Sequence, residues 1–186
     1  MDVTINLEQI KLETDRMVLR AWRETDLGDF YEYASVPGVG EMAGWKHHES
    51  MDVSRSVLQS FLAAQDQFAL VCKENQKVIG SLGLNKSWAN EDPELSCLKL
   101  KDIGYVLSKA YWGCGFMAEA VKVVIAFCFD ELELNAVTSG HAPSNMQSKR
   151  VLEKCGFEYV KTSEHYDAQF ELRTHSMRYI LLRAQS

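Results

Sequence analysis

The segment "DIGYVLSKAYWGCGFMAEA" (102–120) constrains the fold of this 186-residue chain more than any other stretch. Its first part, "DIGYVLS" (102–108), has the alternating apolar pattern of a β-strand. Gly113 and Gly115 follow, and from Met117 onward apolar residues recur at the spacing of one helix face. Two glycines before a helix permit a tight turn with positive φ or the close approach of a ligand to the backbone. The segment therefore predicts a strand, a glycine loop and a helix in direct succession.

The glycine loop also has the features of a phosphate site. A helix N-terminus offers N–H groups without intrahelical partners and a partial positive charge, and glycines let a pyrophosphate approach them. A Walker loop is excluded, because "GFMAEA" lacks the required Lys followed by Ser or Thr. A Rossmann fingerprint would open the first strand–helix–strand unit, whereas this loop lies past the midpoint of the chain. Cys114 adds the alternative of a reactive thiol, but no histidine has a sequence position that ties it to Cys114.

Periodicity and turn residues predict the remaining elements. Strands are expected at 16–22, 67–72, 77–84, 135–141, 157–161 and 176–183, and helices at about 26–34, 53–62, 117–132 and 144–156. The stretches 36–45 and 87–99 are expected to be loops. Because antiparallel hairpins come first and strand–helix alternation comes later, the order predicts a mixed α+β fold rather than a doubly wound sheet.

Composition excludes several classes of protein. The chain is 46% apolar and 25% charged, as is ordinary for a soluble globular domain, and it has no apolar run long enough to span a membrane. A net charge of −6 argues against a nucleic-acid binder. Five cysteines, an odd number without CxxC spacing, predict a reduced, cytoplasmic protein with buried thiols and neither disulfides nor a metal site.

The predicted helix at 144–156 supplies a second, independent signal. Its apolar face begins with two polar residues, Asn145 and Ser148, one turn apart. Polar groups on a buried face need hydrogen-bond partners. Asn145 is expected either to cap the helix or, together with Ser148, to line a groove for a ligand with a long arm.

Two of these motifs resemble the GNAT superfamily of N-acetyltransferases, specifically its RimJ/RimL-like branch. The matching residues are "DIGYVLSKAYWGCGFMAEA" (102–120) and "SNMQSKRVLEKCGF" (144–157), and "ETDRMVLRAWRETD" (13–26) resembles the first strand and helix of that family. The resemblance implies a single domain over residues 1–186, with a core at about 12–183. Its α+β fold would have a mixed central sheet that is splayed at the CoA-binding strand and flanked by helices.

The resemblance further implies acetyl-CoA as the donor, with no metal and no covalent acetyl-enzyme. Its pyrophosphate would lie on the loop amides and its pantetheine arm on the splayed strand, with Asn145 bonding the pantetheine and Ser148 near the thioester sulfur. The implied cofactor-binding residues are Tyr105, Val106, Leu107, Trp112, Gly113, Cys114, Gly115, Phe116, Met117, Ala118, Asn145 and Ser148.

Two positions depart from the family pattern. Ala110 stands where the superfamily has an Arg or Gln, and Leu152 stands where many relatives have a Tyr that protonates the leaving thiolate. Ser148 is therefore the candidate acid. Asp102 is the candidate base, because some relatives have a carboxylate there, and it is expected to begin its strand. Glu41, His47 and His48 are alternative bases in a glycine-rich loop.

The implied reaction moves an acetyl group from acetyl-CoA to a primary amine, which is either a protein N-terminus or a small molecule. The acceptor pocket would be built from the loops 36–50, 85–99 and 163–175. These loops carry residues suited to a cation: Trp45, Trp88, Glu91, Asp92, Tyr166 and Asp167. A monomer or a homodimer is expected. Two alternatives are a non-catalytic acyl-CoA-binding or sensor domain and a nucleotide-binding α/β domain.

Overall fold

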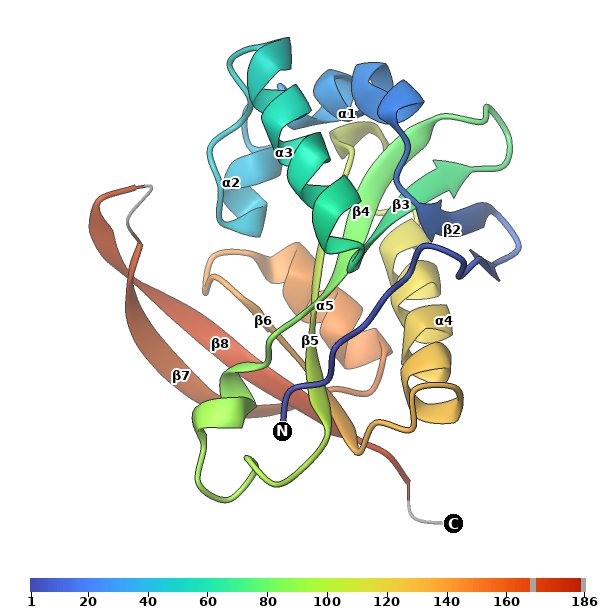
Figure 1. Ribbon diagram of the computed structural model, residues 1–186. Helices are drawn as coiled ribbons and strands as arrows, with labels where there is room; N and C mark the ends of the chain where they lie inside the picture. The colour runs from blue at the N-terminus through green and yellow to red at the C-terminus, as the bar shows by residue number, and fades with distance from the viewer. Residues whose placement is uncertain (168–169, 185–186) are drawn as a thin grey trace. The chain divides into compact units, whose positions relative to one another are not determined.

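A computed structural model describes residues 1–167 and 170–184 (Figure 1). Its strands are β1 (Leu12–Glu13), β2 (Met17–Ala21), β3 (Gln67–Cys72), β4 (Val78–Asn85), β5 (Leu100–Leu107), β6 (Ala136–His141), β7 (Glu158–Asp167) and β8 (Leu172–Leu182). Its α-helices are α1 (Leu27–Ala34), α2 (Val39–Ala43), α3 (Met51–Ala64), α4 (Phe116–Asp130) and α5 (Met146–Lys154). Three short 3-10 helices are η1 (Glu24–Asp26), η2 (Trp88–Glu91) and η3 (Lys109–Tyr111).

The chain divides into two compact units, and β4, β5 and α4 contribute residues to both. The amino-terminal unit consists of Ile5–Gly83 and Tyr105–Ala120. The carboxy-terminal unit consists of Met1–Thr4, Leu84–Gly104 and Val121–Ser186. The strands are antiparallel from β1 to β4, β5 and β6 run parallel, and β6, β8 and β7 are again antiparallel. This mixed, eight-stranded α+β architecture confirms the fold class predicted from the sequence.

In the amino-terminal unit, helices α1 and α3 pack beside each other over strands β3 and β4 (Figure 1). Trp22, Phe30, Tyr33 and Leu58 form the centre of its core, together with apolar residues of the strands. Burial of such large side chains is the main stabilising contribution to a unit of this size. Ser50 caps α3 by accepting a hydrogen bond from the Val53 N–H, and Asp29 of α1 accepts one from the first residue of β4.

In the carboxy-terminal unit, β7 and β8 form a long hairpin that pairs with β6 through β8 (Figure 1). The sequence predicts much shorter strands there, at 157–161 and 176–183. Polar alternation on a partly exposed hairpin gives a weak hydrophobic signal, which is why its extension was not predicted. Ala89, Leu100 and Ala136 form a small buried cluster in this unit.

Two segments expected to be loops contain short helices. Residues 36–45 include α2, which lies between Gly38 and Gly44, both in the left-handed region. Residues 87–99 include η2, which Ser87 caps. The prediction of buried thiols is confirmed for Cys72 and Cys128 and is wrong for Cys97 and Cys114, which are exposed, whereas Cys155 is partly buried. Within 1–167 and 170–184, no helix combines the length and the apolar character that a membrane crossing requires.

Candidate active site

The glycine loop has the backbone conformation that its sequence predicts. Gly113 and Gly115 adopt φ values of 78° and 84°, in the left-handed region that strains residues with a Cβ. A Cβ at Gly113 would meet nothing within 4 Å, so backbone conformation rather than space requires a glycine there. Helix α4 begins directly after the loop, and the Glu119 N–H bonds the Gly115 carbonyl at 3.1 Å. The amides of Phe116 and Met117 therefore lie at the first turn, where a helix has no carbonyl partners for them.

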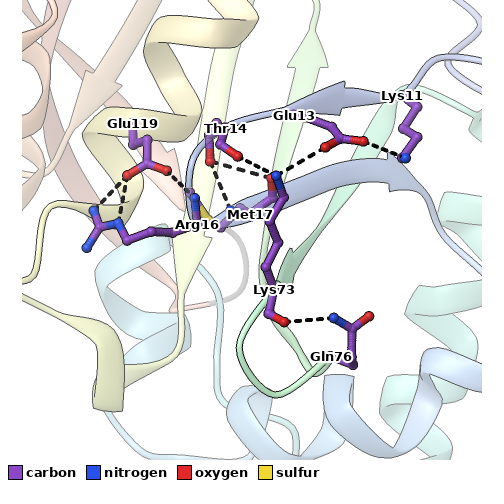
Figure 2. A network of polar contacts seen from close by, with 8 residues as sticks. All are labelled: Lys11, Glu13, Thr14, Arg16, Met17, Lys73, Gln76 and Glu119. Atoms are coloured by element: carbon purple, nitrogen blue, oxygen red, sulfur yellow. Dashed lines mark hydrogen bonds and ion pairs between the residues drawn. The ribbon is translucent and has the colours of Figure 1, made fainter.

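Arg16, which directly precedes β2, contacts both this loop and Glu119 of α4, and Figure 2 shows its contacts with Glu119. Its Nη1 donates to the Cys114 carbonyl at 3.0 Å, and its Nε donates to Glu119 Oε2 at 2.8 Å. Its backbone N–H donates to Glu119 Oε1 at 3.1 Å. The guanidinium carbon also lies 4.0 Å from the centre of the Phe116 ring. One cation thus connects a loop carbonyl with an aromatic ring and a carboxylate that both belong to the first turn of α4.

Glu119 is ionised by these contacts. Burial alone would raise its pKa, but hydrogen bonds from Thr14 and Arg16 outweigh this effect and hold the pKa below its ordinary value. The helix dipole stabilises a carboxylate in the first turn, but the same carboxylate repels a phosphate bound at that end of the helix. The Arg16 guanidinium, with Nη2 at 2.7 Å from Glu119 Oε2, offsets this negative charge. The loop can therefore combine an acidic first turn with anion binding.

Aromatic side chains hold the remainder of the loop. Trp112 packs against the core of the amino-terminal unit, and its indole N–H donates to the Leu107 carbonyl at 2.8 Å. Tyr111 and Phe116 make an edge-to-face contact with ring centroids 5.4 Å apart. The side chains of Trp112 and Phe116, both predicted to be near the cofactor, thus position the backbone between them.

The end of β5 carries the residues predicted to bind pantetheine. Val106 and Leu107 are buried, with exposed fractions of 8% and 7%, and Tyr105 is partly buried. Gly80 allows β4 to lie close to the backbone of β5 here, since a Cβ on it would clash with the Val106 carbonyl oxygen. The Leu107 carbonyl already accepts the Trp112 indole N–H. Close packing on Gly80 and the Trp112 hydrogen bond thus hold the backbone of Val106 and Leu107 in place.

Cys114 has the geometry of a spacer rather than of a nucleophile. Its thiol is exposed and donates weakly to the Trp112 carbonyl at 3.5 Å. No histidine contacts it in the part of the chain that the structure describes. Its carbonyl, held by Arg16, is its strongest polar contact. The structure thus gives Cys114 a role through its backbone.

In the carboxy-terminal unit, Asn145 caps α5. Its Oδ1 accepts the Ser148 N–H at 3.0 Å, and its side chain is almost fully buried, with 6% exposed. The first of the two roles considered for Asn145, helix capping, is therefore confirmed. Ser148 takes part in this cap through its backbone, so its hydroxyl is not the group that the cap requires. Gly156, at φ 85°, follows the end of the helix, which is shorter at both ends than the predicted 144–156.

Asp102 does not begin its strand as predicted, because β5 starts two residues earlier, at Leu100. Thr138 of β6 lies in register with it and donates to Asp102 Oδ1 at 2.7 Å. Ser87 Oγ lies 2.8 Å from Thr138 Oγ1, and both hydroxyls are buried. A hydroxyl has one proton to donate, and Thr138 donates it to Asp102. In the contact between Ser87 and Thr138, Ser87 is therefore the donor. Burial is the main influence on Asp102 and raises its pKa, against smaller opposing effects of Thr138 and Arg178.

Asp102 opens into a polar cavity of about 550 Å³ within the carboxy-terminal unit. Residues from the 86–93 segment, β7 and β8 line it, including Trp88, Glu91, Asp92, Lys161, Ser163 and Arg178. Its volume lies in the range of small-molecule sites. Trp88, Glu91 and Asp92, three residues predicted to surround the acceptor, thus belong to one cavity with the predicted base.

The other predicted acceptor residues are not among the described residues that line this cavity. Trp45 packs into the core of the amino-terminal unit beside His48, with ring centroids 5.0 Å apart, so its role there is structural. Tyr166 is exposed, and the side chain of Asp167 lies outside the described part of the chain. No group of three or more metal-binding side chains is present among the described residues.

The alternative bases make local structural contacts. Glu41 accepts hydrogen bonds from the Gly38 N–H at 2.7 Å and from the His47 ring at 2.8 Å. Burial acts against these bonds, which together lower the pKa of Glu41 to about 2. His48 is buried against Ser54, 2.7 Å away, and burial lowers its pKa. These contacts make all three weaker candidates for a base than Asp102.

Sequence reasoning missed Arg16, Glu119, Thr138, Ser87 and Arg178. A partial signal existed for Glu119, an acidic residue in the first turn of a helix that was expected to bind an anion. A nearby cation was therefore needed, but nothing in the sequence identifies Arg16, which is 103 positions away. Thr138 and Ser87 have no local signal, because their contact depends on sheet register.

Comparison with known proteins gives a consistent result. The family model of the acetyltransferase (GNAT) domain matches residues 16–158. The chain is similar to the N-acetyltransferase p20 of Bacillus licheniformis, at 29% identity, over 79% of this chain and 82% of that protein.

Solved structures share the fold. A GNAT-family acetyltransferase of Bacillus anthracis aligns with a TM-score of 0.79 and 19% identity, over 93% of this chain and 98% of that one. The ribosomal-protein-S5-alanine acetyltransferase of Vibrio fischeri aligns with a TM-score of 0.73 and 19% identity, over 94% and 97% of the two chains.

Proposed function

The chain belongs to the acetyltransferase (GNAT) family, and from this premise we propose that it transfers the acetyl group of acetyl-CoA directly to a primary amine. The observation that carries the assignment of the donor is the pair of positive-φ glycines at the start of α4. The loop leads into the first turn of α4, where the Phe116 and Met117 amides have no intrahelical carbonyl partners, and Arg16 offsets the charge of the Glu119 carboxylate. Such a site favours the pyrophosphate of a CoA thioester.

Acetyl-CoA supplies an activated acyl group, and the chain supplies the proton transfers and the positioning. The amine nitrogen attacks the thioester carbonyl carbon, the carbon–sulfur bond breaks, and the amine loses one proton. We assign that proton to Asp102, directly or through a water, because a carboxyl with a raised pKa is a stronger base. The backbone near Val106 would donate to the oxyanion, and Ser148 would protonate the thiolate. Asn145 would bind the pantetheine arm.

Ser148→Ala tests the proposed acid. Because the helix cap uses the Ser148 backbone N–H and the Asn145 side chain, the alanine variant is expected to fold with an intact α5. We expect kcat to fall by about 10²-fold, at the low end for general acid catalysis, with an unchanged KM for acetyl-CoA. Steady-state CoA release measures both constants. An unchanged kcat would assign the proton to another donor.

Cys114→Ser tests direct transfer against an acetyl-enzyme. The change keeps a small polar side chain and leaves the carbonyl contact with Arg16 in place. We expect kcat/KM to stay within about threefold of the original value, since the thiol is not used as a nucleophile. Mass spectrometry of the protein mixed with acetyl-CoA alone should find no acetylated cysteine. A loss near a thousandfold with retained folding would support the covalent route.

A thiol-release screen with acetyl-CoA against small amines and N-terminal peptides tests the function as a whole. Amine-dependent CoA release is expected for at least one class of acceptor. A non-catalytic acyl-CoA sensor would instead gain thermal stability from acetyl-CoA and release no CoA with any amine. We further propose the RimJ/RimL-like branch, on the motifs at 102–120 and 144–157. Because that branch suggests protein N-termini as acceptors, N-terminal peptides belong in the screen.

A further inference from the structure

The cavity beside Asp102 contains one cation that differs from the others. Lys161 lies 2.8 Å from Asp92, and Lys86 lies 3.2 Å from Glu91, so each has a carboxylate partner. Arg178 has none within 4.0 Å among the residues that the structure describes. A guanidinium that is half-buried and lacks a counterion is costly unless a ligand or solvent satisfies its donors.

The sheet holds Arg178 in a defined position. Arg178 on β8 lies in register with Gly140 on β6, and its Nε donates to Ser163 Oγ on β7 at 2.7 Å. A Cβ on Gly140 would lie 2.9 Å from Ser176 Oγ, 3.1 Å from the Met177 carbonyl oxygen and 3.4 Å from Arg178 Nη1, so β8 packs closely at this glycine and the guanidinium lies beside it. With Nε engaged, the two Nη groups are the donors that remain for a ligand.

Asp102 shares this face of the sheet. It pairs in register with Thr138, and Thr138 and Gly140 point to the same face because they are two residues apart on β6. The Arg178 charge acts on the Asp102 carboxyl through space, without forming an ion pair. The cavity thus presents one carboxyl, which can hold or deprotonate an amine, and one separate guanidinium, which can bind an anion.

We propose that Arg178 binds a carboxylate of the acceptor, so that this cavity selects an amine that also carries an acidic group. The inference rests on the proposed function and specifies its acceptor class. An amino acid or an N-terminal residue beside an acidic side chain would both present this chemistry. Polyamines are disfavoured, because they would bring positive charge next to Arg178.

Turnover with matched acceptors tests the proposal. Glycine, β-alanine and γ-aminobutyrate are compared with their methyl esters, and a Gly-Asp peptide amide is compared with the Gly-Asn analogue. We expect kcat/KM to favour the carboxylate in at least one matched pair by about tenfold, as for a hydrogen bond to a charged group. The pair that shows the preference distinguishes a free amino acid from a peptide. A polyamine preferred over every carboxylate would overturn the proposal.

In Arg178→Met the ratio of kcat/KM between the carboxylate acceptor and its neutral analogue should fall to about one. Arg178→Lys should retain part of the preference, because lysine keeps the charge but cannot donate two parallel hydrogen bonds to a carboxylate. Arg183→Met removes an exposed arginine just after the same strand and should keep the preference. Thermal denaturation of each variant establishes that it is folded. A carboxylate preference that persists in Arg178→Met would contradict the inference.

Binding separates this inference from the proposed function. Calorimetry with the same acceptors in the presence of CoA, the product, requires no catalysis. Binding that requires the acceptor's carboxylate and is lost in Arg178→Met would support the inference. This holds even if no acceptor caused CoA release, in which case only the proposed function would be wrong. Turnover without any carboxylate preference would support the proposed function and overturn the inference. Absence of both binding and turnover with the carboxylate series would also overturn it.

Discussion

Asp102→Asn is expected to lower kcat by about 10²- to 10⁴-fold, the range for loss of a general base. The substitution keeps the shape of the side chain and an oxygen that can accept the Thr138 hydroxyl, which donates to Asp102 at 2.7 Å. The KM for acetyl-CoA should change little, because Asp102 is not assigned to donor binding. Asp130→Asn, an exposed change at the end of α4, is the matched control and should behave as the unchanged protein.

The pH dependence of the same reaction follows from the environment of Asp102. Burial raises its pKa above the ordinary 3.8, so in a plot of kcat against pH the loss of activity on the acid side (the acid limb) should have its midpoint above that value. The Thr138 hydroxyl stabilises the carboxylate form, and Thr138→Val should therefore move the acid limb to still higher pH. A pH profile of Asp102→Asn with an unchanged acid limb would exclude Asp102 as the base.

Stability should move in the opposite direction from activity. An acid whose pKa is raised in the folded state contributes stability that is complete below its unfolded pKa and is lost as pH rises through its folded pKa. At neutral pH, Asp102 therefore costs stability, and Asp102→Asn should raise the melting temperature relative to the original protein. This gain should disappear below the unfolded pKa. Activity lost with stability gained is the signature of a functional carboxyl rather than a structural one.

Arg16→Met is expected to raise the KM and Kd for acetyl-CoA by about 10- to 100-fold, because several hydrogen bonds to charged groups are lost at once. The variant frees the Cys114 carbonyl and leaves the Glu119 carboxylate without its cation, beside the helix end that receives phosphate. The kcat at saturating acetyl-CoA should remain within about threefold, because Arg16 positions the loop and does not act on the reacting atoms.

A double-mutant cycle with Glu119→Gln separates repulsion from general damage. Removing the carboxylate as well should restore part of the affinity lost in Arg16→Met, giving a favourable coupling between the two changes. Lys73→Met removes a cation from the neighbouring network, where Lys73 contacts Glu13 and the Thr14 carbonyl, and should leave the KM unchanged (Figure 2). Fully additive losses, or a collapse of kcat with unchanged Kd, would contradict the positioning role.

Short-range information in the sequence was sufficient for the candidate loop. Gly113 and Gly115 permit the positive φ that the loop adopts, and the apolar stripe from Met117 defines the following helix through contacts only a few residues apart. The cap of α5 by Asn145 is local in the same sense, since donor and acceptor are three residues apart. Steric limits on φ and ψ and hydrogen bonds within one turn depend on near neighbours, so the sequence alone predicts them.

Only the tertiary structure determined which side chains complete these sites. Arg16 reaches Glu119 because β2 lies beside the start of α4, and Arg178 faces Gly140 because β8 pairs with β6 in one register. A slip of one residue would turn Arg178 to the other face of the sheet, since side chains alternate along a strand. The burial that raises the Asp102 pKa likewise comes from segments distant in sequence. Register and burial are properties of the assembled sheet, and local periodicity contains no information about them.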